Sequence, residues 1–238
     1  MNFQAVDIHA GYVPGIDILR GLSIEARDGE VTTVIGANGV GKSTFLKCAI
    51  GQLRPHSGTI SYGDLDLTRL ETHDLVRHGI AYLAQGRNIF PHMSVLENLQ
   101  MGVWSIRDDR DRCSGAIERA FEGAPILGDF KHRRAGEMSG GQQRVLEIQR
   151  ALMTDPTLLL IDEPSVGLDP KMTDMIYDHL RALASDHRHT ILIVDQNVIA
   201  GTDIADHIYV LELGANKFDC TKRDFDGTYR ETIAEWLI

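Results

Sequence analysis

A glycine-rich loop carries the first candidate chemistry in the chain. It reads GANGVGKST and fits the pattern GxxxxGK[ST], between a β-branched run at Val31–Ile35 and a helix-forming run at Phe45–Ile50. Glycines let backbone N–H groups wrap phosphates, and the start of a helix adds positive potential. We therefore predict a nucleotide-phosphate site formed by Gly36, Ala37, Asn38, Gly39, Val40, Gly41, Lys42, Ser43 and Thr44.

Two side chains of this loop have separate expected roles. The Lys42 ammonium is expected to reach the β- and γ-phosphates of ATP, and the Ser43 hydroxyl is a candidate ligand of Mg²⁺. A glycine-rich turn without a ligand is the alternative interpretation. The strand pattern before the loop and the helix pattern after it argue against that alternative.

Two adjacent carboxylates follow an apolar run at Leu158–Ile161. Open α/β sheets bind ligands at the carboxyl ends of their strands. Asp162 is expected to hold Mg²⁺ through water, which leaves Glu163 free to act as a general base on the attacking water. Asp-Glu-Pro on its own could be an ordinary exit from a strand into a turn, and the upstream loop favours the catalytic interpretation.

A third motif, Ser-Gly-Gly-Gln-Gln, begins at Ser139 and has two compatible interpretations. Serine followed by two glycines suits the N-cap of a helix that continues over Arg144–Leu152. A glycine-rich helix N-terminus is also a site for an anion. Both interpretations need the same local geometry.

These three motifs, in this order over about 130 residues, resemble the ATP-binding cassette, the ATPase of ABC transporters. The resemblance covers nearly the whole chain. It implies that each ATP lies between two subunits, with Mg²⁺ as cofactor. The signature residues of one subunit would then act in trans on ATP held by Lys42 of the other, and these are Ser139, Gly140, Gly141 and Gln142.

The same resemblance assigns roles outside the three motifs. Gln85 resembles the family's Q-loop glutamine, which contacts Mg²⁺ or the lytic water, and Tyr12 stands where an aromatic ring stacks on adenine. Asp169 resembles the D-loop residue that crosses the dimer interface. The plain alternatives are a loop amide for Gln85, a core aromatic for Tyr12 and an Asp-Pro helix start for Asp169 and Pro170.

The chain departs from the general pattern after Ile191–Val194. Most cassettes place a histidine there to contact the γ-phosphate, whereas this chain has Asp195, Gln196 and Asn197. The Gln196 amide can still donate to a phosphate oxygen, but it cannot carry the positive charge of an imidazolium. We predict that histidine protonation is not a switch at this position.

That departure narrows the resemblance to a subfamily. Three segments resemble one of the two ATPases of branched-chain (hydrophobic) amino-acid uptake. They are Gln-Gly-Arg-Asn-Ile-Phe-Pro from Gln85, Gly-Glu-Met before Ser139 and Val-Asp-Gln-Asn from Val194, where members of that subfamily usually read VEQN. Close relatives import urea and short amides. The C-terminal Trp236–Ile238 and Arg144 do not distinguish this subfamily from other ABC ATPases.

The subfamily also implies partners. These are a second ABC ATPase subunit, membrane permease subunits and, indirectly, a substrate-binding protein. A heterodimer is expected in the cell and a homodimer is possible in isolation, with the permease contact around Gln85–Met93.

Local patterns predict the elements that must position these residues. Short β-like pieces indicate an N-terminal antiparallel lobe at Phe3–Ile8, Ile16–Leu19 and Leu22–Ala26. Later strands alternate with helices, which indicates a mainly parallel sheet flanked by helices. The expected segments are Leu158–Ile161, a helix near Pro170–Ser185, Thr190–Val194, a helix towards Ile204 and His207–Leu211.

Charged helical patterns at Val95–Val103 and Arg110–Glu122 indicate an inserted helical subdomain. The expected fold class is α/β, a P-loop NTPase of the ABC type. We expect one domain over residues 1–238, with the β lobe and RecA-like core in 1–85 and 150–238 and the helical subdomain in about 86–149.

Composition limits the partners and the location. The 238 residues are 43% hydrophobic and carry 34 acidic against 24 basic side chains, a net charge of −10 that disfavours nucleic acid or lipid headgroups as main partners. The apolar runs are too short to span a bilayer, and a secretory signal is not apparent. We expect a cytoplasmic protein, peripheral at the inner face of the membrane through its permease. Cys48, Cys113 and Cys220 are expected to be buried or incidental thiols.

Three other functions fit parts of the sequence. ABC ATPases that act on ribosomes or DNA usually carry two cassettes or a long coiled coil, and this chain shows neither. An ABC subunit for export would often be fused to its permease. A regulatory module that binds nucleotide without hydrolysing it would not need Glu163.

Overall fold

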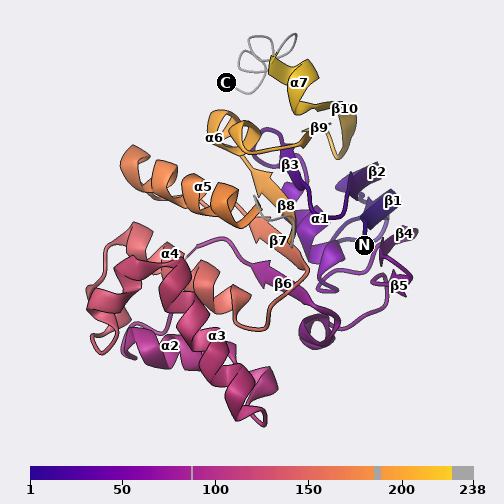
Figure 1. Cartoon of the computed structure of the whole chain (residues 1–238). Helices are drawn as coiled ribbons and strands as arrows, with labels where there is room; N and C mark the ends of the chain where they lie inside the picture. The colour runs from indigo at the N-terminus through magenta and orange to yellow at the C-terminus, as the bar shows by residue number, and fades with distance from the viewer. Residues whose placement is uncertain (87, 185–188, 227–238) are drawn as a thin grey trace.

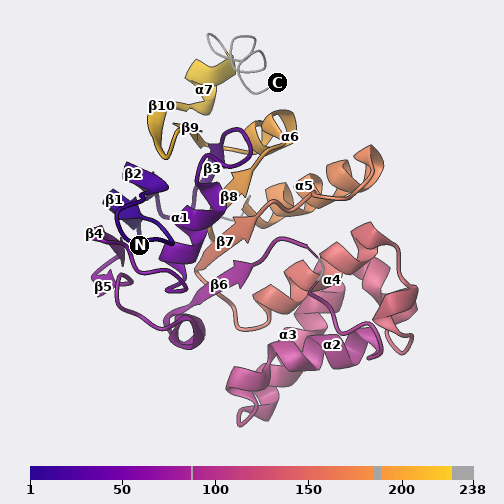
Figure 2. The same cartoon turned by 180° about the vertical axis from the view of Figure 1, so that it is seen from behind.

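The computed structural model describes residues 1–86, 88–184 and 189–226 (Figure 1). Arg87 in the expected permease surface, Ser185 at the expected end of a helix and Trp236–Ile238 lie outside the described residues. The chain forms two sheets with helices between and around them (Figures 1 and 2).

The first sheet is antiparallel, in the order β2-β1-β4-β5. Its strands are β1 Phe3–Ala10, β2 Leu19–Ala26, β4 Ser57–Tyr62 and β5 Leu65–Asp66. The expected antiparallel lobe is therefore confirmed. The expected strand piece at Ile16–Leu19 is wrong, because Pro14 and Gly15 make a tight turn in which the Ile16 N–H donates to the Val13 carbonyl at 3.0 Å, and pairing resumes only at Leu19.

The second sheet has six strands in the order β10-β9-β3-β8-β7-β6. Every neighbouring pair is parallel except β10 with β9. The mainly parallel core was thus predicted correctly. The strands are β3 Val31–Ile35, β6 Ile80–Leu83, β7 Leu158–Asp162, β8 Thr190–Asp195, β9 His207–Glu212 and β10 Ala215–Thr221.

Two layers of side chains hold the parallel sheet. Helix α1, Lys42–Ala49, lies between the two sheets (Figure 1), where Phe45 and Leu46 share a buried cluster with Phe3 and Leu192. On the other face of the sheet, helix α5, Pro170–Ala184, shares a buried cluster with strand residues such as Ile191. Because both faces are covered, β3, β7 and β8 are buried along their whole length, as a parallel sheet requires.

The remaining helices group mainly around α4 (Figures 1 and 2). Helices α2 Val95–Gly102, α3 Arg110–Gly123 and α4 Gly140–Leu152 fall between β6 and β7 in the chain, and their apolar faces join the same buried cluster as Ile161. Short 3-10 helices occur at Thr72–His78, Trp104–Ile106, Pro125–Phe130 and Ala135–Glu137. Helix α6, Val198–Asp203, follows β8, and helix α7, Lys222–Asp224, follows β10.

Local capping explains where two of these helices begin. The Ser94 hydroxyl accepts from the Glu97 N–H while the Glu97 carboxylate accepts from the Ser94 N–H, a reciprocal capping box that starts α2. The Asp109 carboxylate caps α3 by accepting from the Arg112 N–H. Among the described residues, no helix combines the length and apolar character needed to cross a bilayer. The three cysteines are free thiols, and two of them are buried.

Candidate nucleotide site

The site residues meet because three parallel strands end side by side. In the sheet register, Ile35 of β3 pairs with Asp195 of β8, and Asp162 of β7 pairs with Val194 of β8. The loop that starts at Gly36 therefore leaves the sheet beside the Asp195 end of β8, and the Asp162 end of β7 lies on the other side of β8. Carboxyl ends of parallel strands are where open α/β sheets place ligands.

The glycine-rich loop bends sharply into the start of α1. Gly39 and Gly41 have φ values of 83° and 110°, and a Cβ on Gly41 would come within 2.8 Å of Leu19 Cδ2. Glycine is needed at position 41 for both reasons. The loop borders a cavity of about 290 Å³ lined by Ile18, Asn38, Gly39, Gly41, Lys42, Ser43, Thr44 and Glu163.

Lys42 is buried at the first position of α1 and is folded back over its own loop. Its Nζ donates to the carbonyl oxygens of Gly36 at 2.7 Å and Ala37 at 3.1 Å. Burial lowers the pKa of Lys42, and the negative charges of Glu163, Asp195 and Asp162 act in the opposite direction. Lys42 thus places a cation in the lining of the cavity, where it can attract an incoming anion.

Asp162 provides a buried carboxylate oxygen that lacks a partner. Among the described residues, Oδ1 has no hydrogen-bond donor, whereas Oδ2 accepts from the Tyr82 hydroxyl at 3.4 Å. Burial, followed by the charge of Glu163, raises the pKa of Asp162, while the neighbouring Tyr82, Lys42 and Ser43 side chains lower it. An unpartnered buried oxygen beside a serine hydroxyl suits a hard cation such as Mg²⁺, which prefers oxygen ligands.

Glu163 and Gln85, which the sequence suggested separately, lie in direct contact. Gln85 Nε2 donates to Glu163 Oε2 at 2.6 Å. Glu163 has φ of 43°, a left-handed backbone that non-glycine residues rarely adopt, and its N–H donates to the Val194 carbonyl at 2.8 Å. A buried carboxylate held by one amide beside the phosphate loop can accept a proton from water.

Tyr12 is exposed, with 54% of its surface accessible, so it does not serve as a core aromatic. Lys47 of α1 donates from Nζ to the Tyr12 hydroxyl at 3.1 Å and lies 5.1 Å from the ring centroid. This contact holds the ring beside the last turn of α1, with its remaining surface open to a flat aromatic ligand.

The signature residues form the start of α4 as expected. Gln142 N–H donates to the Ser139 hydroxyl at 3.3 Å, and Ser139 N–H donates to the Gln142 side-chain oxygen at 2.9 Å. A Cβ on Gly141 would lie 2.3 Å from Met172 Sδ, so α4 can approach α5 closely only with glycine at position 141. Of the described residues that line the cavity at Lys42, none belongs to this motif.

Gln196 does not line the cavity at Lys42 but a neighbouring hollow of about 480 Å³, beside residues 165–168 of the expected D-loop. Its side chain is exposed, and its backbone N–H donates to the Asp195 carboxylate at 2.7 Å. The Asn197 N–H donates to the same oxygen at 2.8 Å, and the buried Tyr177 hydroxyl also donates to Asp195. Asp169 caps α5 by accepting from the Met172 N–H at 3.0 Å.

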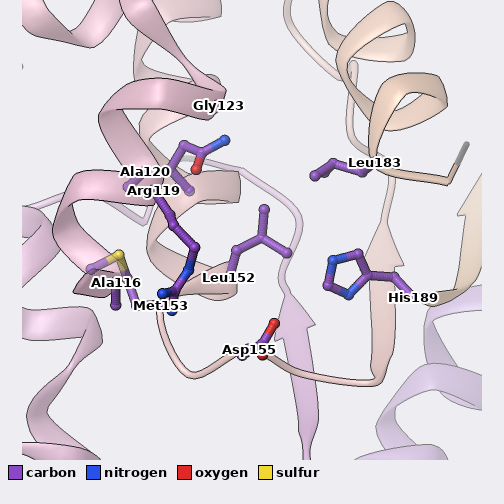
Figure 3. A pocket seen from close by; sticks show the side chains of 10 residues that line it. Ala116, Arg119, Ala120, Gly123, Leu152, Met153, Asp155, Leu183 and His189 are labelled. Carbon is purple, nitrogen blue, oxygen red and sulfur yellow. The ribbon is translucent and has the colours of Figure 1, made fainter. Parts of the chain in front are cut away.

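Another hollow, of about 150 Å³, is lined by residues from α3, from the last turn of α4 and from α5 (Figure 3). It is lined by Leu152, Met153 and Leu183 together with Arg119 and His189, and His189 Nδ1 already bonds to the Pro156 carbonyl at 2.7 Å. It has no glycine-rich loop and no helix start in its described lining. The cavity at Lys42 is therefore the better candidate for a nucleotide.

Sequence reasoning missed several residues that shape the site. Tyr82 and Tyr177 reach the two strand-end aspartates, Lys47 holds Tyr12, and Ile18 closes the cavity. Lys47 falls one turn after Ser43 on α1, so its helical spacing was a usable signal. Tyr82, Tyr177 and Ile18 come from segments far along the chain, and only the folded arrangement brings them near.

Together the loop, the strand ends and the cavity define a P-loop nucleotide-binding protein with a parallel α/β core. The family model described as ABC transporter matches residues 19–166, and the chain belongs to that family. Members of the family bind ATP and hydrolyse it to power transport, and the chain is an ATPase of this class. ABC ATPase subunits dimerise and pair with permease components.

Named relatives match along nearly their whole length. BraG of Pseudomonas aeruginosa, a high-affinity branched-chain amino acid transport ATP-binding protein, is 39% identical over 90% of this chain and 89% of its own. LivF of Archaeoglobus fulgidus, a probable branched-chain amino acid transport ATP-binding protein, is 34% identical over 93% and 92%. The solved structure of MJ1267, an ATP-binding cassette of an ABC transporter, has 29% identity and a TM-score of 0.85 over 99% and 98%.

The environment of Asp195 predicts a pH-dependent stability. Burial raises its pKa to about 7, against an unfolded value of about 4, so the folded chain keeps this proton while the unfolded chain loses it. The contribution of this group to the free energy of unfolding is fully present below about pH 4 and is lost as the pH rises through about 7. The loss is at most roughly 4 kcal/mol. We expect Asp195→Asn to remove this slope from urea unfolding curves.

The exposed Asp178→Asn is the matched control and should keep the slope of the unaltered chain. If Asp195→Asn keeps the same decline between pH 4 and pH 7, the account of this carboxyl is wrong.

Proposed function

We propose that this chain is the ATP-hydrolysing subunit of an ABC importer for branched-chain or other hydrophobic amino acids. The observation that carries the catalytic part is the contact of Gln85 with Glu163 beside the phosphate loop. Support for the substrate class comes from BraG and LivF, whose names specify branched-chain amino acid transport. Urea or amide uptake, and export, are the alternatives.

ATP binding uses the loop and the first turn of α1. The backbone N–H groups of residues 36–44 surround the phosphates, and Lys42 exchanges its bonds to the Gly36 and Ala37 carbonyls for bonds to phosphate oxygens. Tyr12 stacks on the adenine, with Lys47 holding the ring in place. Each of these groups comes from the same chain.

The metal site fits Ser43, Asp162 and Gln85. Ser43 and Asp162 face each other across the end of β7, and Asp162 Oδ1 is the unpartnered acceptor. Mg²⁺ bound here, with Asp162 acting through water, would offset the charge of the phosphate oxygens. Gln85 is bonded to Glu163 and can turn its amide oxygen to the same position.

Hydrolysis needs a base that the metal does not occupy. Glu163 accepts the proton of the attacking water while Gln85 orients that water or the carboxylate. Gln196 donates to a phosphate oxygen, which requires it to turn from the hollow that it lines towards the cavity at Lys42. These three side chains and Lys42 form the proposed catalytic set.

The second half of each site comes from another subunit. At the start of α4, Ser139 is exposed, Gly140 and Gln142 are half-buried and Gly141 is buried, and we propose that these four residues close over the γ-phosphate held by the partner subunit. Asp169 lies at the exposed end of the D-loop and faces the same interface. A second ATPase chain is the proposed partner in the cell, and two copies of this chain can pair in isolation.

The permease would contact the surface over Gln85–Met93. Phe90 is 42% exposed there, and it lines a hollow with Met101 and Asn88 that can take an apolar segment. We propose that residues 1–238 form one domain. Within it, the helical subdomain of about residues 86–149 rotates against the β lobe and core when ATP is bound and hydrolysed. The chain would then be a cytoplasmic protein held at the inner face of the membrane by its permease.

The role of Glu163 gives the first functional prediction. Glu163→Gln keeps the size of the side chain and an oxygen for the Gln85 amide, but it removes the base. We expect ATP turnover to fall by about a hundredfold or more while the Kd for ATP changes by less than about twofold.

Glu212→Gln, at the exposed end of strand β9 in the same sheet, is the control and should keep full turnover. Undiminished turnover in Glu163→Gln would remove the assigned base.

The transport role predicts both partners and substrate. Purification of the chain from its native membranes should bring down permease subunits and a second ATP-binding subunit. Deleting the gene that encodes the chain from its native cell should abolish uptake of labelled leucine and leave uptake of urea unchanged. Loss of urea uptake alone would move the proposal to amide import, and a complex with ribosomes but without membrane proteins would contradict transport.

A further inference from the structure

Arg144 has a position that the proposed function does not yet explain. It lies on α4, five residues after Ser139, and its guanidinium is buried, with 6% of the side chain exposed. Nη1 donates to the carbonyls of Ala84 at 3.0 Å and Gly86 at 3.1 Å. Nε donates to the Pro164 carbonyl at 3.1 Å, and Nη2 donates to the Asp162 carbonyl at 3.4 Å.

These four carbonyls have one property in common. Ala84 and Gly86 flank Gln85, while Asp162 and Pro164 flank Glu163. One planar guanidinium therefore fixes the backbone on both sides of each residue, and the two side chains meet at 2.6 Å. A lysine could not do the same, because it offers a point charge and not a fork of five N–H groups.

Glu147 completes the arrangement from the next turn of α4. Its Oε2 accepts from Arg144 Nη1 at 2.7 Å, and its Oε1 accepts from the Asn88 N–H. The Glu147 side chain is 1% exposed, so each charge of the pair needs the other. Through these two side chains, α4 holds the backbone at residues 84, 86 and 88.

The backbone of Glu163 needs such support. Its φ of 43° is a conformation that persists in a non-glycine residue only when the surroundings fix it. Arg144, on α4, fixes this conformation through its bonds to the carbonyls before and after Glu163. The Val194 carbonyl, in the sheet, fixes it by accepting from the Glu163 N–H. The conformation of the proposed base therefore depends on where α4 lies.

We propose that Arg144 is a positioning residue that couples the two nucleotide sites of the dimer. This inference rests on the proposed function of Ser139 in trans. About 7.5 Å of rigid helix separates Ser139 from Arg144. When Ser139 engages the γ-phosphate held by the partner subunit, α4 shifts, and Arg144 moves the backbone that carries Gln85 and Glu163. ATP in one site thereby sets the geometry of the base in the other.

Arg144→Lys tests the coupling while keeping a positive charge beside Glu147. We expect kcat for ATP hydrolysis to fall by about tenfold to a hundredfold, as a small misplacement of catalytic groups produces, with KM within about twofold. The coupling also predicts a Hill coefficient above 1 for the unaltered dimer, and we expect it to fall to about 1 in the variant. Arg144→Gln with Glu147→Gln removes both buried charges together and should give the same result.

Arg150→Lys is the matched control. Arg150 lies on the same helix and bonds to the Asn88 carbonyl over the Phe90 ring, but it does not contact a carbonyl next to Gln85 or Glu163 among the described residues. It should keep both kcat and the Hill coefficient within about twofold. A role for Arg144 in folding alone would weaken ATP binding and turnover together.

The outcomes separate this inference from the proposed function. Unchanged kcat in Arg144→Lys, a parallel loss of ATP binding, or a lower kcat with unchanged cooperativity each overturns the coupling. If the unaltered chain hydrolyses no ATP, or Glu163→Gln has no effect, the proposed function itself fails.

Discussion

The parallel register of β3, β7 and β8 is the constraint on which the site depends. Ile35 lies beside Asp195, and Asp162 lies beside Val194, so the phosphate loop and the carboxylates leave the sheet at one edge. A shift of one residue in either pairing would turn the strand-end side chains to the other face of the sheet. The buried layers on both faces, around Phe45 and Ile176, hold that register.

The same edge concentrates negative charge in a poorly solvated place. Asp162, Glu163 and Asp195 are buried around Lys42, and burial raises the pKa of both aspartates. Such a cluster is costly unless something neutralises it. The buried Lys42 ammonium does so in part, and a metal ion with bound nucleotide would add positive charge at Asp162 Oδ1. The arrangement therefore favours ligand binding over maximal stability.

Much of this could be predicted from sequence because the signals are local. The phosphate loop, the buried strand Val31–Ile35 and the N-cap at Ser139 depend on neighbours within a few residues. The expected strand at Ile16–Leu19 was wrong because the Pro14-Gly15 turn outweighs its apolar pattern. The roles of Tyr177 and Arg144 could not be predicted, since the Asp195 carboxylate that Tyr177 bonds to and the carbonyls that Arg144 bonds to lie at least 18 residues away.

The central claim is that each ATP site is divided between two subunits, and complementation tests it directly. Lys42→Ala and Ser139→Glu should each leave a nearly inactive dimer, since one loses the phosphate cation and the other puts a carboxylate against the partner's phosphate. Mixing the two chains creates dimers with one doubly altered site and one intact site. The account predicts that ATP turnover rises above that of either variant alone, to at most about a quarter of the unaltered rate, since about half of the dimers are mixed, each has one intact site, and loss of coupling slows that site. No recovery, with mixed dimers demonstrated in the sample, would contradict it.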